Sequence, residues 1–237
     1  MNPSLVLIPG LNNTHAVFDG VVSALPPSID PLALDNPPLD SVEAIAHALL
    51  PRLPPRFWLA GFSFGGYVSL AMLELAPERI AGLALLCTSP FADSPAASDK
   101  RRAALEAVAS GHYLEWVEAQ VANTFHPESL NNTALMAMRR KMLLDYGPHA
   151  YAAHVRATMT RVDRRHLLDG RHPTLVLAAS NDRLFPPESM ASLAQGIAGA
   201  RFGLVQHAGH LMPLEQPAEV ARLLSDWMIS AASSSSP

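Results

Sequence analysis

The sequence lacks the features that mark several large classes of proteins. Its 237 residues contain a single cysteine, Cys87, so no disulfide can form within the chain. Cys87 lies in an apolar run, where a thiol usually behaves as a small buried hydrophobic group. The apolar stretch near the N-terminus, Leu5–Ile8, is too short for a signal peptide or a membrane span. These absences predict a soluble cytoplasmic protein.

Basic blocks and metal-binding clusters are also missing. The formal net charge is −4 at pH 7 and no run of lysine or arginine stands out, which argues against nucleic acid as a partner. No histidines show metal-ligand spacing, and there is no Cys/His cluster. Gly-x-Gly-x-x-Gly and other phosphate-binding loops are absent too. We therefore expect neither a metal nor a nucleotide cofactor.

What the chain does have is apolar sequence in short runs. Hydrophobic residues make up 49% of it, enough for one large core. The runs are short enough to be strands buried on both faces, and helical patterns separate them. This alternation predicts an α/β fold with a doubly wound, mostly parallel sheet of about six strands, which binds ligands at the strand C-termini. The expected strands are Leu5–Ile8, Pro31–Leu34, Phe57–Phe62, Ile80–Cys87, Thr174–Ala179 and Phe202–Val205.

The strand rhythm stops between Phe91 and Arg165. This stretch has the pattern of three or four helices, of which Gly111 ends the first and Pro148 opens the last. We expect it to be an inserted helical cap over the C-terminal ends of the strands, where a ligand would bind. Its methionine and aromatic side chains suit apolar ligands, and the candidate pocket residues are Trp116, Met138, Met142 and Tyr151.

The interruption of the strand pattern divides the chain into a core, a cap and a C-terminal segment. Residues 1–90 and 166–229 are expected to form the core, and 91–165 the cap. A helix should start at Pro217, a favoured first-turn residue. The segment 230–237 is small and polar and is predicted to be disordered.

The most informative run is Phe57–Gly66, where an apolar strand leads into Gly-x-Ser-x-Gly and a helical pattern follows at once. In that context the serine, Ser63, lies on a sharp strand-to-helix turn with its hydroxyl above the sheet. Gly61 and Gly65 are small enough to let strand and helix approach each other closely. The run predicts that Ser63 is a nucleophile, which needs a neighbouring base.

Two later strand ends supply candidate partners for Ser63. Asp182 follows one predicted strand and His210 follows the next, in the chain order nucleophile, acid, histidine. His210 is the expected base, and Asp182 the group that orients it. His207, three residues before His210, is an alternative base. The alternative acids, which precede the strand, are Asp163 and Asp169.

With these residues placed, the chain resembles the α/β-hydrolase fold family. Within it, the similarity is to small bacterial carboxylesterases, enol-lactonases and SHCHC synthases that carry a four-helix cap. The resemblance rests on Pro9-Gly10, the turn at Ser63, Asp182 and the run Gly209–Pro217. Members commonly begin with a two-strand hairpin, which is absent here, and have a histidine where this chain has Pro9.

The resemblance also implies an oxyanion hole built from backbone amides. The amide of Phe64 follows from the geometry of the turn, because this residue comes directly after the nucleophile. The family pattern implies Leu11 as the second donor, with Asn12 one residue further on as the alternative. In the cap, Arg139, Arg140 and Arg156 either hold a substrate carboxylate or carry ordinary solvated charge.

These residues predict a cofactor-independent serine esterase acting on a small ester or lactone. Ser63 would attack the carbonyl, and water activated by His210 would release the acid from an acyl-enzyme. A lactonase, a carbon–carbon bond hydrolase or a lyase would use the same three residues. A non-catalytic small-molecule receptor on the same fold is a more distant alternative. The substrate and the oligomeric state stay open.

Overall fold

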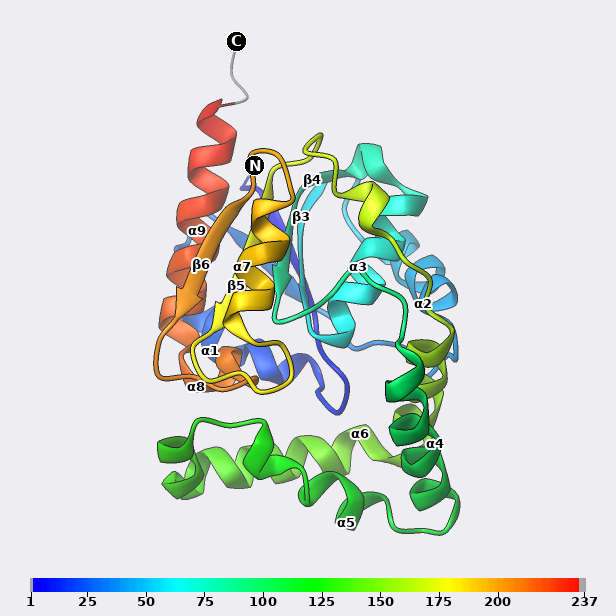
Figure 1. The fold of residues 1–237 in the computed structure, drawn as a ribbon. Coiled ribbons are helices and arrows are strands. Elements are labelled where there is room, and N and C mark those ends of the chain that lie inside the picture. Colours follow the sequence, from blue (N-terminus) through cyan, green and yellow to red (C-terminus); the bar gives the residue numbers. More distant parts are fainter. Residues whose placement is uncertain (1, 235–237) are drawn as a thin grey trace.

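A computed structural model describes residues 2–234 of the chain. Within them the sheet has six strands, all parallel, in the order β2-β1-β3-β4-β5-β6 (Figure 1). The expected α/β fold with a doubly wound sheet is confirmed. The strands are β1 (Ser4–Ile8), β2 (Asp30–Ala33), β3 (Phe57–Phe62), β4 (Ile80–Leu86), β5 (Thr174–Ala179) and β6 (Arg201–Val205).

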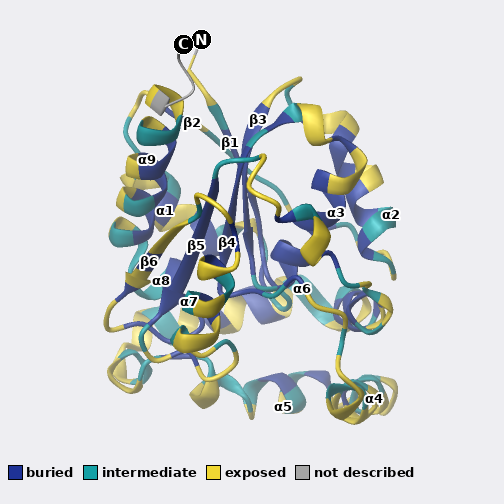
Figure 2. Cartoon of the chain, turned by 45° about the horizontal axis from the view of Figure 1, so that its top comes forward, coloured by how far each residue is buried: buried dark blue, intermediate teal, exposed yellow. Residues whose placement is uncertain are grey.

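The central strands are buried on both faces, as their continuous apolar runs predict (Figure 2). Side chains alternate between two cores along each strand. On β3, Phe57 and Leu59 pack with one cluster, whereas Trp58 packs with the other. The first cluster lies under α2, α3 and α7, and the second under α1, α8 and α9. Their bounds are α1 (Asp19–Ala24), α2 (Val42–Leu49), α3 (Phe64–Leu75), α7 (Pro187–Gln195), α8 (Met212–Glu215) and α9 (Pro217–Ser234).

Helix α9 runs further than the sequence predicts. It begins at Pro217 as expected but continues through Ser234, so the predicted disorder is wrong for residues 230–234. Apolar packing of the preceding turns supports this extension: Trp227 is buried and meets Trp58 edge to face, with ring centroids 4.8 Å apart. Residues 235–237 lie outside the described residues.

Between β4 and β5 the chain forms α4 (Pro95–Ala109), α5 (Tyr113–Glu118) and α6 (Thr133–Thr160). Figure 1 shows α5 and part of α6 crossing the end of the sheet where the strands terminate. Helix α6 is interrupted at Gly147, whose φ of 71° and ψ of 168° are not helical, so a new helical segment opens at Pro148 as predicted.

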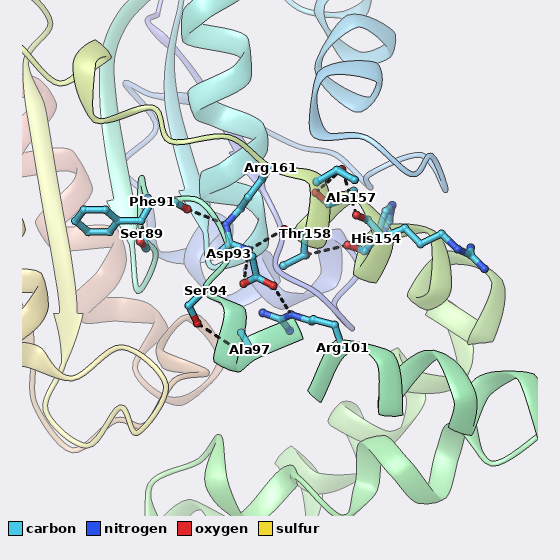
Figure 3. A network of polar contacts seen from close by, with 12 residues as sticks. Ser89, Phe91, Asp93, Ser94, Ala97, Arg101, His154, Ala157, Thr158 and Arg161 are labelled. Atoms are coloured by element: carbon cyan, nitrogen blue, oxygen red, sulfur yellow. Dashed lines mark hydrogen bonds and ion pairs between the residues drawn. The ribbon is translucent and has the colours of Figure 1, made fainter. Parts of the chain in front are cut away.

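A buried acid ties the two ends of this insertion together. Figure 3 shows Asp93, just before α4, facing two arginines. Its Oδ1 lies 2.8 Å from Nη1 of Arg161, which follows α6, and its Oδ2 lies 3.5 Å from Nε of Arg101 on α4. The Arg161 Nε also donates to the carbonyl oxygen of Phe91, at 3.0 Å. The helices therefore enter and leave the core at one place.

Candidate active site

Ser63 occupies a strained turn between β3 and α3. Its φ of 52° and ψ of −117° are uncommon for a residue with a side chain. The surrounding backbone holds it there: the Ser63 amide donates to the carbonyl oxygen of Leu86 at 2.9 Å, and the Thr88 hydroxyl donates to the Ser63 carbonyl oxygen at 2.7 Å. The turn directs the hydroxyl towards the C-terminal edge of the sheet.

The glycines beside Ser63 are required by close backbone contacts. A Cβ on Gly65 would lie far inside van der Waals distance of the carbonyl oxygen of Ile8, which is backbone and cannot move aside. A Cβ on Gly61 would lie 2.5 Å from the carbonyl oxygen of Gly65. Helix α3 can approach β1 at Gly65 and β3 at Gly61 this closely only because both positions lack a side chain.

The structure brings Ser63, His210 and Asp182 together. The His210 Nε2 lies 2.9 Å from Ser63 Oγ, and its Nδ1 lies 2.8 Å from Asp182 Oδ2. A carboxylate accepts only, so Nδ1 carries the proton and Nε2 is free to accept from the Ser63 hydroxyl. His210 and Asp182 are only 6% and 4% exposed. The hydroxyl thus faces a base whose tautomer is fixed.

Asp182 stays ionised in this buried position. Burial alone would raise the pKa of its carboxyl, but the charge and hydrogen bond of His210 and the amides of Phe185 and Leu184 outweigh burial and hold the pKa below its usual value. The amides of Leu184 and Phe185 donate to Oδ1 at 2.7 and 3.0 Å. These bonds leave Oδ2 directed at His210.

Neighbouring groups also fix the His210 ring. It packs against Phe62 and Phe185, with ring centroids 5.1 and 5.7 Å away. The carboxylate of Glu215 accepts from the Gly209 amide at 2.8 Å, which secures the loop just before the histidine. Its other oxygen accepts from the His126 amide at 2.7 Å, which joins that loop to the segment before α6.

The alternative acids and base lie elsewhere. The His207 ring packs against the ring of His126, and its carbonyl oxygen accepts from the side chain of Gln216. The alternative acids pair with nearby arginines: Asp163 with Arg165, and Asp169 with Arg171.

Cys87 lies beside the triad but does not fit a catalytic or metal-binding role. It is buried, and burial, reinforced by the nearby Asp182 carboxylate, raises the pKa of its thiol well above the usual value. Its sulfur, with Asp182 and His210, belongs to a group of potential metal ligands within 4.8 Å of one another. Nδ1 of His210 donates its proton to Asp182, and the one lone pair of the ring, on Nε2, already accepts from the Ser63 hydroxyl.

Both expected oxyanion donors line a cavity beside Ser63. Within the described residues, the amides of Leu11 and Phe64 donate to no protein acceptor, and Phe64 is the first residue of α3, where the helix end favours negative charge. The amide of Asn12, the alternative donor, is hydrogen-bonded to Tyr146. Leu11 is therefore the better placed of the two.

The cavity has a volume of about 240 Å³ and is bounded on one side by the cap. Trp116 and Tyr151 line it, and the indole Nε1 donates to the Tyr151 hydroxyl at 3.0 Å. The other two expected pocket residues are not among its lining. Met138 is 47% exposed on the outer face of α6, and Met142 is buried in the core. Both face away because α6 turns a different side to the cavity.

Comparison with known proteins agrees with this geometry. A family model described as the alpha/beta hydrolase fold matches residues 38–217, which is more than half of the chain. The chain belongs to the α/β-hydrolase family.

Named relatives of this hydrolase include esterases. The chain is 27% identical to the pimeloyl-[acyl-carrier protein] methyl ester esterase of Nitrosomonas europaea, an alignment that covers 91% of each protein. Among solved structures, a thermophilic esterase from Thermogutta terrifontis, with malate bound, superposes with a TM-score of 0.90 at 26% identity, over 98% of this chain and 91% of that one. The enol-lactonase of Burkholderia xenovorans shares the fold, with a TM-score of 0.85 at 22% identity, over 97% and 92% of the two chains.

Sequence reasoning missed two features of the hydrolase site. Glu215 was part of a recognised run, but nothing local indicates that it bridges two loops. Tyr146 lies in no recognisable motif, although its hydroxyl bonds both Asn12 and the ring of His154. Its contacts lie far away in sequence, so no local pattern identifies them.

Proposed function

We propose that this chain is a serine hydrolase that cleaves small carboxylic esters through an acyl-enzyme on Ser63. The observation that supports it most directly is the pair of hydrogen bonds that joins Ser63 Oγ to His210 and His210 to Asp182, beside a cavity of about 240 Å³. Relatives named as carboxylic ester hydrolases support the same class of reaction.

The proposed reaction has two halves. Ser63 Oγ attacks the ester carbonyl carbon while Nε2 of His210 takes its proton. The amides of Leu11 and Phe64 stabilise the negative oxygen of the tetrahedral intermediate. As this intermediate collapses, the histidine returns the proton to the departing alcohol. Water, deprotonated by the same nitrogen, then attacks the acyl-enzyme. The histidine passes this proton to Ser63 Oγ as the bond to the acyl group breaks, and the acid is released. Asp182 stabilises the imidazolium in both halves.

We assign residues 91–165 the role of a cap that limits the size of the substrate, with 1–90 and 166–229 as the catalytic core. Three cap residues support this: Trp116, Val117 and Tyr151 line the same cavity as the nucleophile. No helix within residues 2–234 is both long and apolar enough to span a bilayer. The cytoplasmic location expected from the sequence stays a prediction.

The test is hydrolysis of a panel of short p-nitrophenyl esters, methyl esters and lactones. We expect the wild-type protein to hydrolyse esters, and Ser63→Ala to lose at least about 10³-fold in kcat/KM. If the protein hydrolyses the lactones of the panel but none of the esters, it is a lactonase that uses the same residues and not an esterase. Ester hydrolysis that survives in Ser63→Ala would contradict the proposal.

A further inference from the structure

Several positively charged side chains, and no acidic ones from residues 2–234, line the cavity beside Ser63. Three of its lining residues are cations: Lys100, Arg101 and Arg139. None of the described residues that line it is an aspartate or a glutamate. A small cavity bounded by one sign of charge raises the local concentration of ligands of opposite charge.

The three cations are not equivalent. Lys100 is exposed at the mouth of the cavity. Arg101 has a partner, because its Nε lies 3.5 Å from the buried carboxylate of Asp93 (Figure 3). Arg139, on α6, is only 6% exposed, and no carboxylate within residues 2–234 pairs with it. A buried cation without an anion is costly to keep.

The protein satisfies only one side of the Arg139 guanidinium. Its Nη1 donates to the carbonyl oxygen of Asn12 at 2.6 Å and to Oδ1 of Asn13 at 2.8 Å. Its Nε is fully enclosed and has no acceptor, and Nη2 donates to no described residue. Burial lowers the pKa of Arg139 to about 10, so the group is still a cation at neutral pH. Because Nε is enclosed by protein atoms, Nη2 is the donor that remains for a ligand. A hydrogen bond from a guanidinium to a carboxylate is strengthened by the charge on both groups.

We propose that the substrate is an ester carrying a second, ionised carboxylate, and that this carboxylate accepts a hydrogen bond from Nη2 of Arg139. The proposal rests on the proposed function and narrows it to the half-esters of small dicarboxylic acids. Arg139 binds the carboxylate while Ser63 attacks the ester carbonyl, and Lys100 draws the anion to the mouth of the cavity.

The test compares two substrates of equal shape and different charge. Monomethyl esters of malonic, succinic and glutaric acid are paired with the same esters in which the free carboxylate is replaced by a carboxamide. We expect wild-type kcat/KM to favour the acid over the amide for at least one chain length. In Arg139→Met that ratio should fall by about 10- to 100-fold, the loss expected for hydrogen bonds to a charged group.

A neighbouring arginine provides the matched control. Arg140 is adjacent in sequence, exposed, paired with Glu118 and absent from the cavity lining, so Arg140→Met should leave the ratio unchanged. If Arg139 only supports the Asn12 loop, Arg139→Met will slow acid and amide equally and the ratio will not move. That result, or a wild-type preference for the amide at every length, would overturn the proposal.

A binding measurement separates this proposal from the esterase assignment. Succinate or glutarate should raise the melting temperature of Ser63→Ala but not that of Ser63→Ala/Arg139→Met. If the wild type hydrolyses neither ester series while this Arg139-dependent stabilisation is present, the esterase assignment fails and the carboxylate site stands. If the wild type hydrolyses neutral esters and neither dicarboxylate stabilises Ser63→Ala, the esterase assignment stands and the carboxylate site is wrong.

Discussion

Arg139 on α6 donates a hydrogen bond to the backbone carbonyl oxygen of Asn12, over 2.6 Å. Two other side chains from the insertion hold the same residue. The Tyr113 hydroxyl lies 3.2 Å from Asn12 Oδ1, and Tyr146 is bonded to the Asn12 amide. Asn12 has a φ of 61°, a conformation that these contacts help to maintain. The insertion therefore positions the loop that carries Leu11, as well as covering the cavity.

The two histidines of the last loop should differ sharply in their effect on catalysis. His210→Ala removes the group that bonds Ser63 and should lower kcat/KM by at least about 10³-fold. His207→Ala should leave kcat/KM within about threefold of wild type, because its ring packs against His126 instead. Ester hydrolysis by the two purified variants checks this. If His207→Ala were the inactive variant, the base would have been misassigned.

The glycine after the nucleophile should be irreplaceable for stability. Gly65→Ala forces a methyl group against the carbonyl oxygen of Ile8, and we expect a loss of at least about 2 kcal/mol in the free energy of unfolding. Gly196→Ala is the control, because its Cβ would meet no atom closer than 3.5 Å. Urea denaturation measures both, and similar losses in the two variants would show that the close approach at Gly65 is not strained.

His154 should make the folded state sensitive to mild acid. It is fully buried, accepts from Tyr146 through Nδ1 and donates from Nε2 to the Pro37 carbonyl oxygen at 2.8 Å. Burial lowers its pKa, against the effect of the Pro37 carbonyl and together with the charge of His149. The unfolded chain therefore takes up this proton first, and stability should fall as the pH drops below about 6.5.

Urea unfolding at pH 8 and pH 5.5 measures the size of this effect. The wild type should lose more stability between the two pH values than His154→Gln does. His47→Gln, at an exposed position on α2, should lose as much as the wild type. Equal losses in the wild type and His154→Gln would mean that the buried histidine is not the sensitive group.

The cap should set the preference for acyl chain length. Val117 is buried on α5 and lines the cavity, so Val117→Ala enlarges the space beside Ser63. We expect a shift of roughly 10-fold in relative kcat/KM towards longer acyl chains, since one methylene is worth about 1–3 kcal/mol in an apolar pocket. Leu144→Ala, on the exposed side of α6, should not change selectivity. If both substitutions change the stability of the protein but neither changes its selectivity, the cap has a structural role only.

Local sequence patterns were sufficient to predict the sheet and the three hydrogen-bonded residues of the candidate site. Each strand is a short apolar run with clear ends, and Ser63, Asp182 and His210 each directly follow or lie close to such an end. Parallel strands place those ends on one edge of the sheet, so the chain order alone brought the three residues together.

Contacts between distant segments could not be read from the sequence. Met138 and Met142 share a helical pattern, but which side of α6 faces the cavity depends on how the helix docks. Arg139 meets Asn12 from more than a hundred residues away, and a sequence cannot distinguish this arginine from the solvated Arg140 beside it. Helix α9 ends later than the sequence predicts. Its serine-rich last turn would not be helical by itself, but burial of Trp227 stabilises the helix that this turn continues.

The most direct test of the account is the site at which a fluorophosphonate attaches. Such a reagent needs a serine activated by a base, and its adduct can be located by mass spectrometry of peptides from the treated protein. We predict a single labelled residue, Ser63, with labelling lost in Ser63→Ala and at least about 100-fold slower in His210→Ala. Labelling at another residue, or equal labelling of His210→Ala and the wild type, would contradict the assignment of Ser63 as the activated nucleophile.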